Sequence, residues 1–321
     1  MQKIWEKMQK NRIYLVFVCI VAVLFLAICA VKIYQHVTRE TVMIDGQKYY
    51  KKDVTTVLFM GIDNRGEIEG EIGVPGYNGQ ADMLALLIVD NREHSVNIVT
   101  IPRETMVDVD VYDRNGEFQA TRDMQLCLQY AYGTDSKSGC ELTIKAVEGL
   151  FEGIPIDEYI AISMGAIDEV VEAFGGVTVT MTEDHWIPGY EYQAGDTVKL
   201  EGEEAYEFIH FRDTTENGTN LDRMSRQKDF INGLIAQIKA SPIKSMTIIE
   251  GLYSDLQPYM TTSIEKADIW GWIWRGIWID VDEITLERIS GEDIHVEEYD
   301  QYLVDLEEMH KLVLENFYTL H

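Results

Sequence analysis

The fold class follows from Thr55-Thr56-Val57-Leu58-Phe59-Met60, a β-rich run that stops at Gly61 and is followed by Asp63. Two more apolar runs come after it, from Met83 to Val89 and from Val96 to Ile101. Strands that are apolar on both faces belong in the middle of a sheet whose faces are covered. The three runs therefore predict buried central strands.

Segments with helical spacing are mixed with strands over the next hundred and more residues. The elements expected there are helices at Glu141–Phe151, Gly165–Phe174, Glu203–Ile209 and Arg223–Ile238 and a strand at Val177–Met181. Each helix has apolar residues on one side, as a helix that covers a sheet requires. The pattern predicts one α/β domain over residues 53–240, with a mixed central sheet covered by helices.

Residues 241–321 are less regular and are expected to form a helical C-terminal extension that closes the domain. Trp270, Trp274 and Trp278 are spaced by four residues and share one helical face. A packed helix explains this spacing, and a face that meets the membrane surface or stacks on sugars is the alternative.

The N-terminal region predicts a membrane anchor. The run from Ile13 to Val31 contains 19 uncharged, mostly apolar residues, which as a helix spans roughly 28 Å of the ~30 Å bilayer core. A basic segment precedes it, with Lys3, Lys7, Lys10 and Arg12 against Glu6 alone. By the positive-inside rule, residues 1–12 form a cytoplasmic tail, 13–34 a single transmembrane helix and 35–52 a stalk to an exported domain. A cleaved signal peptide is less favoured because its apolar core is usually shorter.

The exported part is strongly acidic. The net charge of −28 becomes −32 without the first 32 residues, which carry five basic residues and one acidic residue. Such a surface repels polyanions at long range, so nucleic acid is excluded as a partner. Any anion that this domain binds needs a local basic pocket.

Cys127 and Cys140 lie in the expected exported part, where a disulfide can persist. They flank a turn-rich stretch from Gly133 to Gly139. A structural bridge is favoured over two free thiols, and the spacing does not fit a zinc site.

Basic residues gather in one segment of this acidic domain: Arg212, Arg223, Arg226 and Lys228. A helix that begins near Leu221 places Arg223 and Gln227 on one face and turns Arg226 away. The N-terminus of a helix and nearby arginines together bind phosphate. Ordinary pairing with surface carboxylates is the alternative.

Charged residues also stand at the ends of the predicted central strands. Asp63 follows the first strand, Asp82 precedes the second, and Arg103 follows the third because Pro102 ends its ladder. Ligands of open α/β sheets bind at strand ends. Carboxylates for a divalent ion and arginines for phosphate oxygens together predict a site for a metal and a pyrophosphate.

Several different short motifs follow one another along the domain. They are Gly61-Ile62-Asp63, Ala81-Asp82-Met83, Ile101-Pro102-Arg103-Glu104-Thr105, Gly153-Ile154-Pro155-Ile156-Asp157, Gly175-Gly176-Val177, Leu200-Glu201-Gly202-Glu203-Glu204-Ala205, Arg212, and Asp222-Arg223 with Arg226-Gln227. From about Thr55 to Gln237 the chain resembles the LytR-CpsA-Psr family of bacterial envelope proteins. An N-terminal anchor with an exported domain is also the plan of that family.

The resemblance implies a transferase of the phosphotransferase type, held at the membrane of a Gram-positive type envelope. Such proteins move an anionic glycopolymer, for example a teichoic acid or capsular polysaccharide, from an undecaprenyl-pyrophosphate carrier to peptidoglycan. The resemblance implies Mg²⁺ or Mn²⁺ on Asp63 and Asp82. It further implies that the pyrophosphate is bound by Gln80, Arg103, His210, Arg212, Arg223 and Gln227, with Arg103, Asp82 and Arg223 as the catalytic residues.

This sequence departs from the family pattern at two positions of the expected site. Gln80 and His210 stand where the family commonly has arginine. An amide is uncharged, and a histidine is charged only at mildly acidic pH. A non-catalytic envelope regulator that binds polyprenyl phosphates is therefore the alternative function, and an acidic adhesin with the same fold is a third.

Overall fold

A computed structural model describes residues 40–64, 66–68, 75–76, 79–93, 95–163, 165–211, 219–272, 284–296 and 299–321. The chain forms two units, one of residues up to Lys52 together with Phe317–His321, and one of Asp53–Asn316. The predicted anchor at 13–34 lies outside the described residues. Among the helices that are described, none is both long and apolar enough to cross a bilayer.

The described part of the small unit is a sheet of β1 (Thr41–Ile44), β2 (Gln47–Lys51) and β17 (Tyr318–Leu320), with β2 in the middle. Asp45 and Gly46 join β1 to β2 with φ angles of 50° and 77°, which suits a two-residue hairpin turn. The C-terminal part of the expected stalk therefore forms two paired strands, because an Asp-Gly turn lies between two segments that alternate in exposure.

The described part of the large unit is built on a six-stranded mixed sheet with the order β13-β8-β3-β4-β5-β14. Its strands are β3 (Val54–Ile62), β4 (Ala81–Asp90), β5 (Val96–Ile101), β8 (Glu158–Ser163), β13 (Met260–Thr262) and β14 (Ile284–Arg288). β4 runs antiparallel to β3 and β5, whereas β8 and β14 run parallel to β3 and β5, respectively. Leu58, Leu84 and Val99 are at most 2% exposed. The mixed sheet with buried central strands is confirmed.

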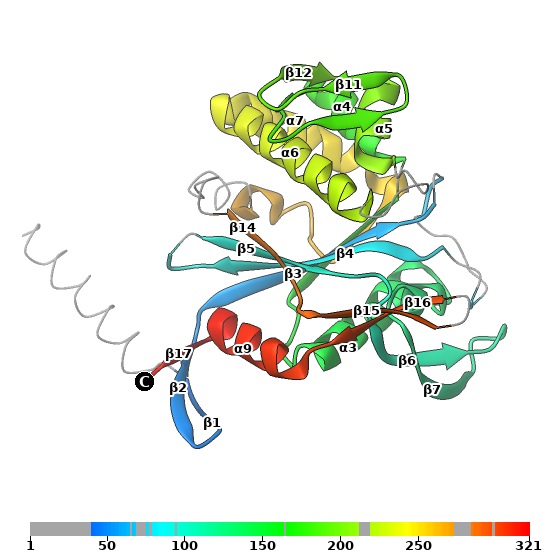
Figure 1. The fold of residues 1–321 in the computed structure, drawn as a ribbon, viewed down its shortest axis with the longest axis vertical. Coiled ribbons are helices and arrows are strands. Elements are labelled where there is room, and N and C mark those ends of the chain that lie inside the picture. Colours follow the sequence, from blue (N-terminus) through cyan, green and yellow to red (C-terminus); the bar gives the residue numbers. More distant parts are fainter. Residues whose placement is uncertain are drawn as a thin grey trace, which may run out of the picture. The chain divides into compact units, whose positions relative to one another are not determined.

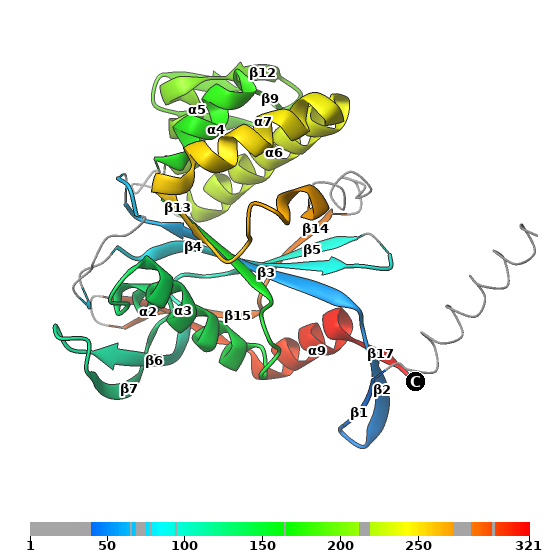
Figure 2. The ribbon, with the colours of Figure 1, turned by 180° about the vertical axis from the view of Figure 1, so that it is seen from behind.

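Helices cover both faces of this sheet (Figures 1 and 2). On one side lie α4 (Ala166–Phe174), α5 (Gly202–His210), α6 (Thr219–Ala240) and α7 (Pro242–Asp255). On the other lie α2 (Cys127–Ala131), α3 (Ser136–Leu150) and α9 (Leu306–Phe317), with the hairpins β6 (Met106–Tyr112)–β7 (Phe118–Gln125) and β15 (Gly291–Val296)–β16 (Tyr299–Val304). The result is a layered α/β fold.

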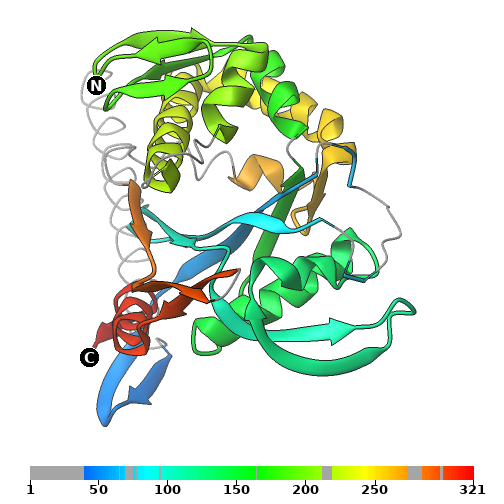
Figure 3. The same cartoon turned by 45° about the vertical axis from the view of Figure 1, so that its right-hand side comes forward.

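A second core lies beyond α5 and α6. Short strands cover these helices on the side away from the central sheet (Figure 3). The strands are β9 (Val177–Thr180), β10 (His185–Ile187), β11 (Tyr190–Tyr192) and β12 (Thr197–Leu200). Ile187, Leu200 and Phe208 are fully buried there, so α6 packs against β9 and its neighbours as well as toward the sheet.

The segment 241–321 differs from the expected helical extension. It contains α7, the one-turn helix η1 (Gln257–Tyr259) and α9, but β13 and β14 complete the two edges of the central sheet. Because β8 and β5 would otherwise expose unpaired backbone groups, strands from the tail satisfy them. Trp270 is 46% exposed, whereas Trp274 and Trp278 lie outside the described residues, so the shared tryptophan face stays a prediction.

Candidate active site

The charged residues expected at the strand ends lie together, where the central strands β3 and β5 end and β4 begins. β3 ends at Ile62 just before Asp63, β4 begins beside it at Ala81, and β5 ends just before Pro102-Arg103. The ladder between β3 and β4 shifts register at Gly61, where an added Cβ would lie only 3.0 Å from the Cβ of Met83. A side chain at residue 61 would thus disturb the turn that presents Asp63.

A cavity of about 500 Å³ opens at these strand ends. Its volume is within the usual range for ligand sites. Its polar lining comes from the sheet and from two helices above it: Asp63, Asp82, Thr100, Arg103, Glu104, Ser163, Tyr206, Glu207, His210, Arg223, Gln227 and Arg288. Six predicted site residues are therefore brought together at one cavity. Gln80 lines a neighbouring, smaller cavity, and Arg212 lies outside the described residues.

Arg103 is the centre of the polar cluster. Its Nη1 forms an ion pair with Asp82, its Nη2 donates to Gln80 Oε1 at 2.9 Å, and its Nε lies 3.5 Å from Glu104 Oε1. The three partners orient the guanidinium while its charge remains next to the cavity. The neutral Gln80 thus accepts a hydrogen bond from Arg103 at a position where a second arginine would repel it.

Asp82 carries an electrostatic cost. Burial raises the pKa of this carboxyl and the nearby Asp63 carboxylate raises it further, against the opposing effect of Arg103 and Arg223. The four charges therefore influence one another across the site. A carboxylate held ionised against its surroundings is typical of a functional site rather than of a stabilising ion pair.

We expect Asp82→Asn to raise the thermal stability of the protein near neutral pH. A raised folded-state pKa means that protonated Asp82 favours folding; this contribution is complete below the ordinary value of 3.8 and is lost as pH rises through the folded-state pKa. The amide imitates the protonated form at every pH. The Tm difference between variant and wild type should thus be small at pH 3.8 and larger at about pH 7. An equal or lower Tm of the variant at neutral pH would contradict this.

The two carboxylates fit a divalent cation. Asp63 and Asp82 supply hard oxygen ligands that face the same site, and within the described residues no group of three or more His, Cys, Asp or Glu side chains is arranged to hold a metal ion. Mg²⁺ is commonly bound by one or two carboxylates, with water and substrate phosphates as its other ligands. The donor set therefore suits magnesium better than zinc.

Helix α6 presents two faces, as its spacing predicts. Arg223 and Gln227 line the cavity, and Gln227 Nε2 also donates to the carbonyl of Ile209 at 3.2 Å. Arg226 points away and is completely buried. The prediction that Arg223 and Gln227 share a face from which Arg226 is turned away is confirmed.

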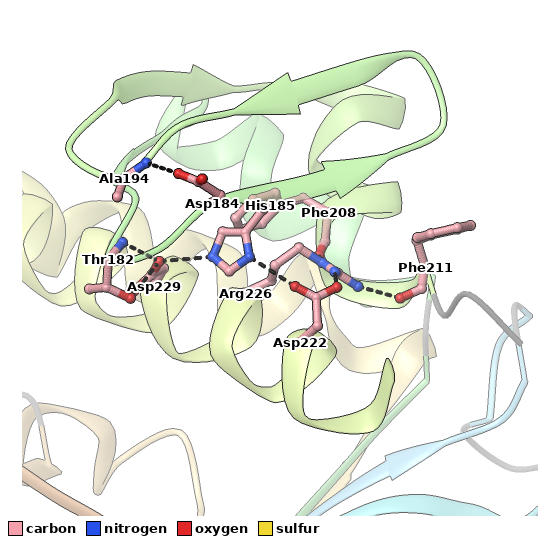
Figure 4. A network of polar contacts seen from close by, with 9 residues as sticks. All are labelled: Thr182, Asp184, His185, Ala194, Phe208, Phe211, Asp222, Arg226 and Asp229. Carbon is pink, nitrogen blue, oxygen red and sulfur yellow. Dashed lines mark hydrogen bonds and ion pairs between the residues drawn. The ribbon is translucent and has the colours of Figure 1, made fainter. Parts of the chain in front are cut away.

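Arg226 joins α6 to the end of α5 (Figure 4). Its Nε donates to the carbonyl of Phe208 at 2.7 Å, its Nη2 donates to the carbonyl of Phe211, and its Nη1 pairs with Asp222. The last carbonyls of a helix have no partner within the helix. Arg226 satisfies two of them, so the cavity residues of α5 and α6 are held in one arrangement.

His185 extends this network to the second core. Its Nδ1 lies 3.0 Å from Asp222 Oδ1 and its Nε2 lies 3.3 Å from Asp229 Oδ2 (Figure 4). Asp229 also accepts from the backbone N–H and the hydroxyl of Thr182 at 2.8 and 2.9 Å. Because ionised carboxylates only accept, the imidazole donates from both nitrogens when both carboxylates are charged. His185 therefore joins two aspartates of α6 to β10.

Arg288 and Tyr206 are among the cavity residues that the sequence analysis missed. Arg288 ends β14 beside β5, and its guanidinium lies 4.5 Å from the centre of the Tyr302 ring. Tyr206 on α5 stacks on the ring of His210 at 4.2 Å, and His210 Nδ1 donates to the Tyr206 carbonyl at 2.9 Å. The strand that carries Arg288 is short and partly polar and lies in the segment expected to be helical, so no local signal marked this residue.

The predicted disulfide is wrong. Cys127 and Cys140 are both free and buried. Cys127 begins α2 beside Arg103, and Cys140 lies within α3. The connection between the helices is closed by backbone packing instead, because a Cβ on Gly133 would lie 2.3 Å from the nitrogen of Gly139.

Both thiols should be alkylated by iodoacetamide after denaturation without reductant, as read by peptide mass spectrometry. In the native protein, Cys127 should react very slowly near pH 8, because burial raises its pKa to about 11 and only the thiolate attacks. Its rate should rise with pH toward that value. Unmodified peptides that separate only after reduction would show that a bridge forms.

Apolar side chains form the rest of the large cavity: Phe59, Met83, Leu84, Ile101, Ile162, Ile167, Ile209 and Phe211. They come from the sheet and from α4 and α5, so the apolar walls adjoin the charged residues at the strand ends. Among apolar positions of the predicted helices, Val147 and Val171 are packed in the core, whereas Ile167 lines the cavity.

Comparison with known proteins gives a consistent result. The LytR_cpsA_psr family matches residues 20–316. The polyisoprenyl-teichoic acid–peptidoglycan teichoic acid transferase TagU of Bacillus licheniformis is 27% identical over 218 residues, which are 68% of this chain and 62% of the length of that relative.

Solved structures share the fold at lower identity. TagV of B. subtilis is 22% identical with a TM-score of 0.61, over 83% of this chain and 98% of that one. A structure of TagT bound to LI-WTA is 21% identical with a TM-score of 0.60, over 82% of this chain and 89% of that one. At these identities the likeness concerns the fold.

Proposed function

Because the chain belongs to the LytR-CpsA-Psr family, we propose that it transfers an anionic glycopolymer, as a glycosyl phosphate, from a polyprenyl-pyrophosphate carrier to a hydroxyl group of peptidoglycan. The observation that carries this is the large cavity, whose lining combines Arg103 and Arg223 with both carboxylates and apolar side chains. A pyrophosphate with an apolar tail has this combination of charge and hydrophobicity. The activity stated in the name of the TagU relative agrees with this chemistry.

The arginines would bind the pyrophosphate and neutralise charge as it shifts toward the leaving lipid phosphate. Arg103 and Arg223 offer forked donors, and Gln227 and His210 line the same cavity. Phosphoryl transfer depends on positioning and on stabilising the charge of the transferred group. Arg212 is assigned to this set by its motif alone.

Asp63 and Asp82 would hold Mg²⁺. When bound, the ion would neutralise charge on the pyrophosphate oxygens. Asp82 is oriented by its ion pair with Arg103, and Asp63 follows the end of β3, so both carboxylates would be held ready for the ion. A bound cation would offset the burial and the repulsion by Asp63 that together raise the pKa of Asp82.

The apolar wall would receive the polyprenyl chain, and residues 13–34 would anchor the protein where that lipid resides. The expected location is the cell membrane, with the N-terminus in the cytoplasm and the large unit outside. A polyprenyl chain leaves a bilayer only at high cost, so a membrane anchor would keep the cavity near its donor.

The full chain in lipid vesicles provides the test. It would receive a polyprenyl-pyrophosphate-linked glycopolymer, Mg²⁺ and a soluble peptidoglycan fragment, with and without EDTA. We expect a glycopolymer–peptidoglycan product that requires Mg²⁺. Donor binding without any product would instead support the regulator that binds polyprenyl phosphates. Absence of donor binding would refute both functions.

A further inference from the structure

A second cavity, of about 300 Å³, adjoins the large one. The two share Asp63 and Arg103 as walls. Arg103 faces both, because its Nη2 donates to Gln80, which lines the small cavity, while its Nη1 and Nε meet Asp82 and Glu104, which line the large one. The guanidinium of Arg103 is therefore part of the wall between the two cavities and is accessible from both.

The far wall of the small cavity comes from the end of α2. Leu128, Ala131 and Tyr132 line it. Gly76 donates its N–H to the carbonyl of Ala131 at 2.7 Å, and a Cβ on Gly76 would lie 3.7 Å from the Tyr132 ring. The backbone at Gly76 therefore lies close to the tyrosine.

The near wall is fixed to the strand end that carries Asp63. The N–H of Asp63 donates to the carbonyl of Gln80 at 2.9 Å. Gly79 has φ +24° and leaves only 3.1 Å between an added Cβ and Ile62 Cγ2. A side chain at residue 79 would be strained, so the close approach depends on glycine.

The lining differs in character from that of the large cavity. An amide, a phenol, a carboxylate and a guanidinium meet here around a small volume, and no long apolar wall is present among the described lining residues. Amide and phenol groups exchange hydrogen bonds with sugar hydroxyls, and a tyrosine ring offers an apolar face to a sugar ring. The cavity fits a polar, ring-shaped ligand rather than a lipid.

Resting on the function proposed above, we propose that this small cavity binds the acceptor sugar of peptidoglycan, with Tyr132 and Gln80 as its binding residues. A transfer between two substrates needs the acceptor hydroxyl beside the phosphorus held in the large cavity. The shared wall of Asp63 and Arg103 is where the two ligands meet. Separate cavities let a lipid and a sugar be recognised by different chemistry.

The step balances at this wall. The oxygen of the acceptor hydroxyl forms a bond to the phosphorus that carries the glycopolymer. The bond from that phosphorus to the bridging oxygen breaks, and polyprenyl monophosphate leaves with its electron pair. The hydroxyl proton ends on the departing monophosphate.

The experiment separates acceptor binding from donor binding in the full chain. Saturation-transfer NMR measures binding of a soluble disaccharide-peptide fragment of peptidoglycan, and a separate titration measures binding of undecaprenyl pyrophosphate. Tyr132→Ala should weaken fragment binding and raise the acceptor KM about tenfold, with donor binding within about twofold of wild type. Tyr112→Ala, a half-buried tyrosine of β6 that contacts Phe118, is the matched control and should change neither.

Tyr132→Phe keeps the ring and guards against a folding defect of the alanine variant. It should show a smaller loss of fragment binding than Tyr132→Ala. Unchanged fragment binding in both variants, or an equal loss of donor binding, would overturn the acceptor site. If the wild type binds the fragment through Tyr132 but transfers no polymer, the proposed function fails and the sugar site stands. If it transfers polymer with an acceptor KM that both variants leave unchanged, the function stands and the sugar site fails.

Discussion

Arg103→Ala should lower the rate of glycopolymer transfer about a thousandfold, the upper range for removing one preorganised transition-state donor. Arg103 is held by Asp82, Gln80 and Glu104, and it lines both cavities. Its loss removes the positive charge that would face the pyrophosphate and leaves Asp82 without its ion-pair partner. The measurement is product formation by the full chain in vesicles under saturating donor and acceptor.

Arg92→Ala is the matched control. Arg92 is an exposed arginine that follows the other end of β4 and lies 3.5 Å from Asp53. Surface pairs of this kind contribute little to stability, so transfer should stay near the wild-type rate. A loss of less than about tenfold for Arg103→Ala, or an equal loss for Arg92→Ala, would remove Arg103 from the catalytic site.

Arg226→Met should lower stability by about 2–5 kcal/mol, because two carbonyls lose their donor at about 1–3 kcal/mol each. The Asp222 side chain is 42% exposed and adds little to this loss. The methionine fills a similar volume but leaves Asp222 without its arginine and the carbonyls of Phe208 and Phe211 without their donor. A loss of this size should lower Tm by on the order of 10 °C in a domain of this size. Thermal unfolding of the full chain in detergent, followed by circular dichroism, measures it.

Lys228→Met provides the control on the same helix. Lys228 is exposed two residues further along α6, and surface substitutions usually change stability by less than about 0.5 kcal/mol. Arg226→Lys should not restore the wild-type Tm, because an ammonium group cannot reproduce a three-way planar fork. Equal Tm values for Arg226→Met and Lys228→Met would show that the buried network does not brace α5 and α6.

The central strands could be predicted because their signal is local. Leu58, Leu84 and Val99 belong to runs that are apolar on both faces, and such runs have few alternatives to a covered sheet. β13 and β14 escaped prediction because Thr261, Thr262 and Glu287 make their strands polar and short. Their place in the sheet is decided by the edges of β8 and β5, which are distant in sequence.

The site residues also divide into those with a local sequence signal and those without one. Strand-end positions predicted Asp63, Asp82 and Arg103, and helical spacing predicted Arg223 with Gln227. The hydrogen bond between Arg103 and Gln80 joins residues 23 positions apart, and no local rule reveals it. The cysteines show the opposite error, since a short turn-rich loop is compatible with a bridge until the packing of Gly133 on Gly139 is known.

The fate of the phosphorus atoms tests the proposed transfer most directly. A donor labelled with ³²P at the phosphate attached to the glycopolymer would be incubated with the full chain, Mg²⁺ and a peptidoglycan fragment. In the proposed transfer, the label moves to the peptidoglycan product and one unlabelled polyprenyl monophosphate is released per product. Label that remains on the lipid, or a glycopolymer–peptidoglycan product without label, would contradict it.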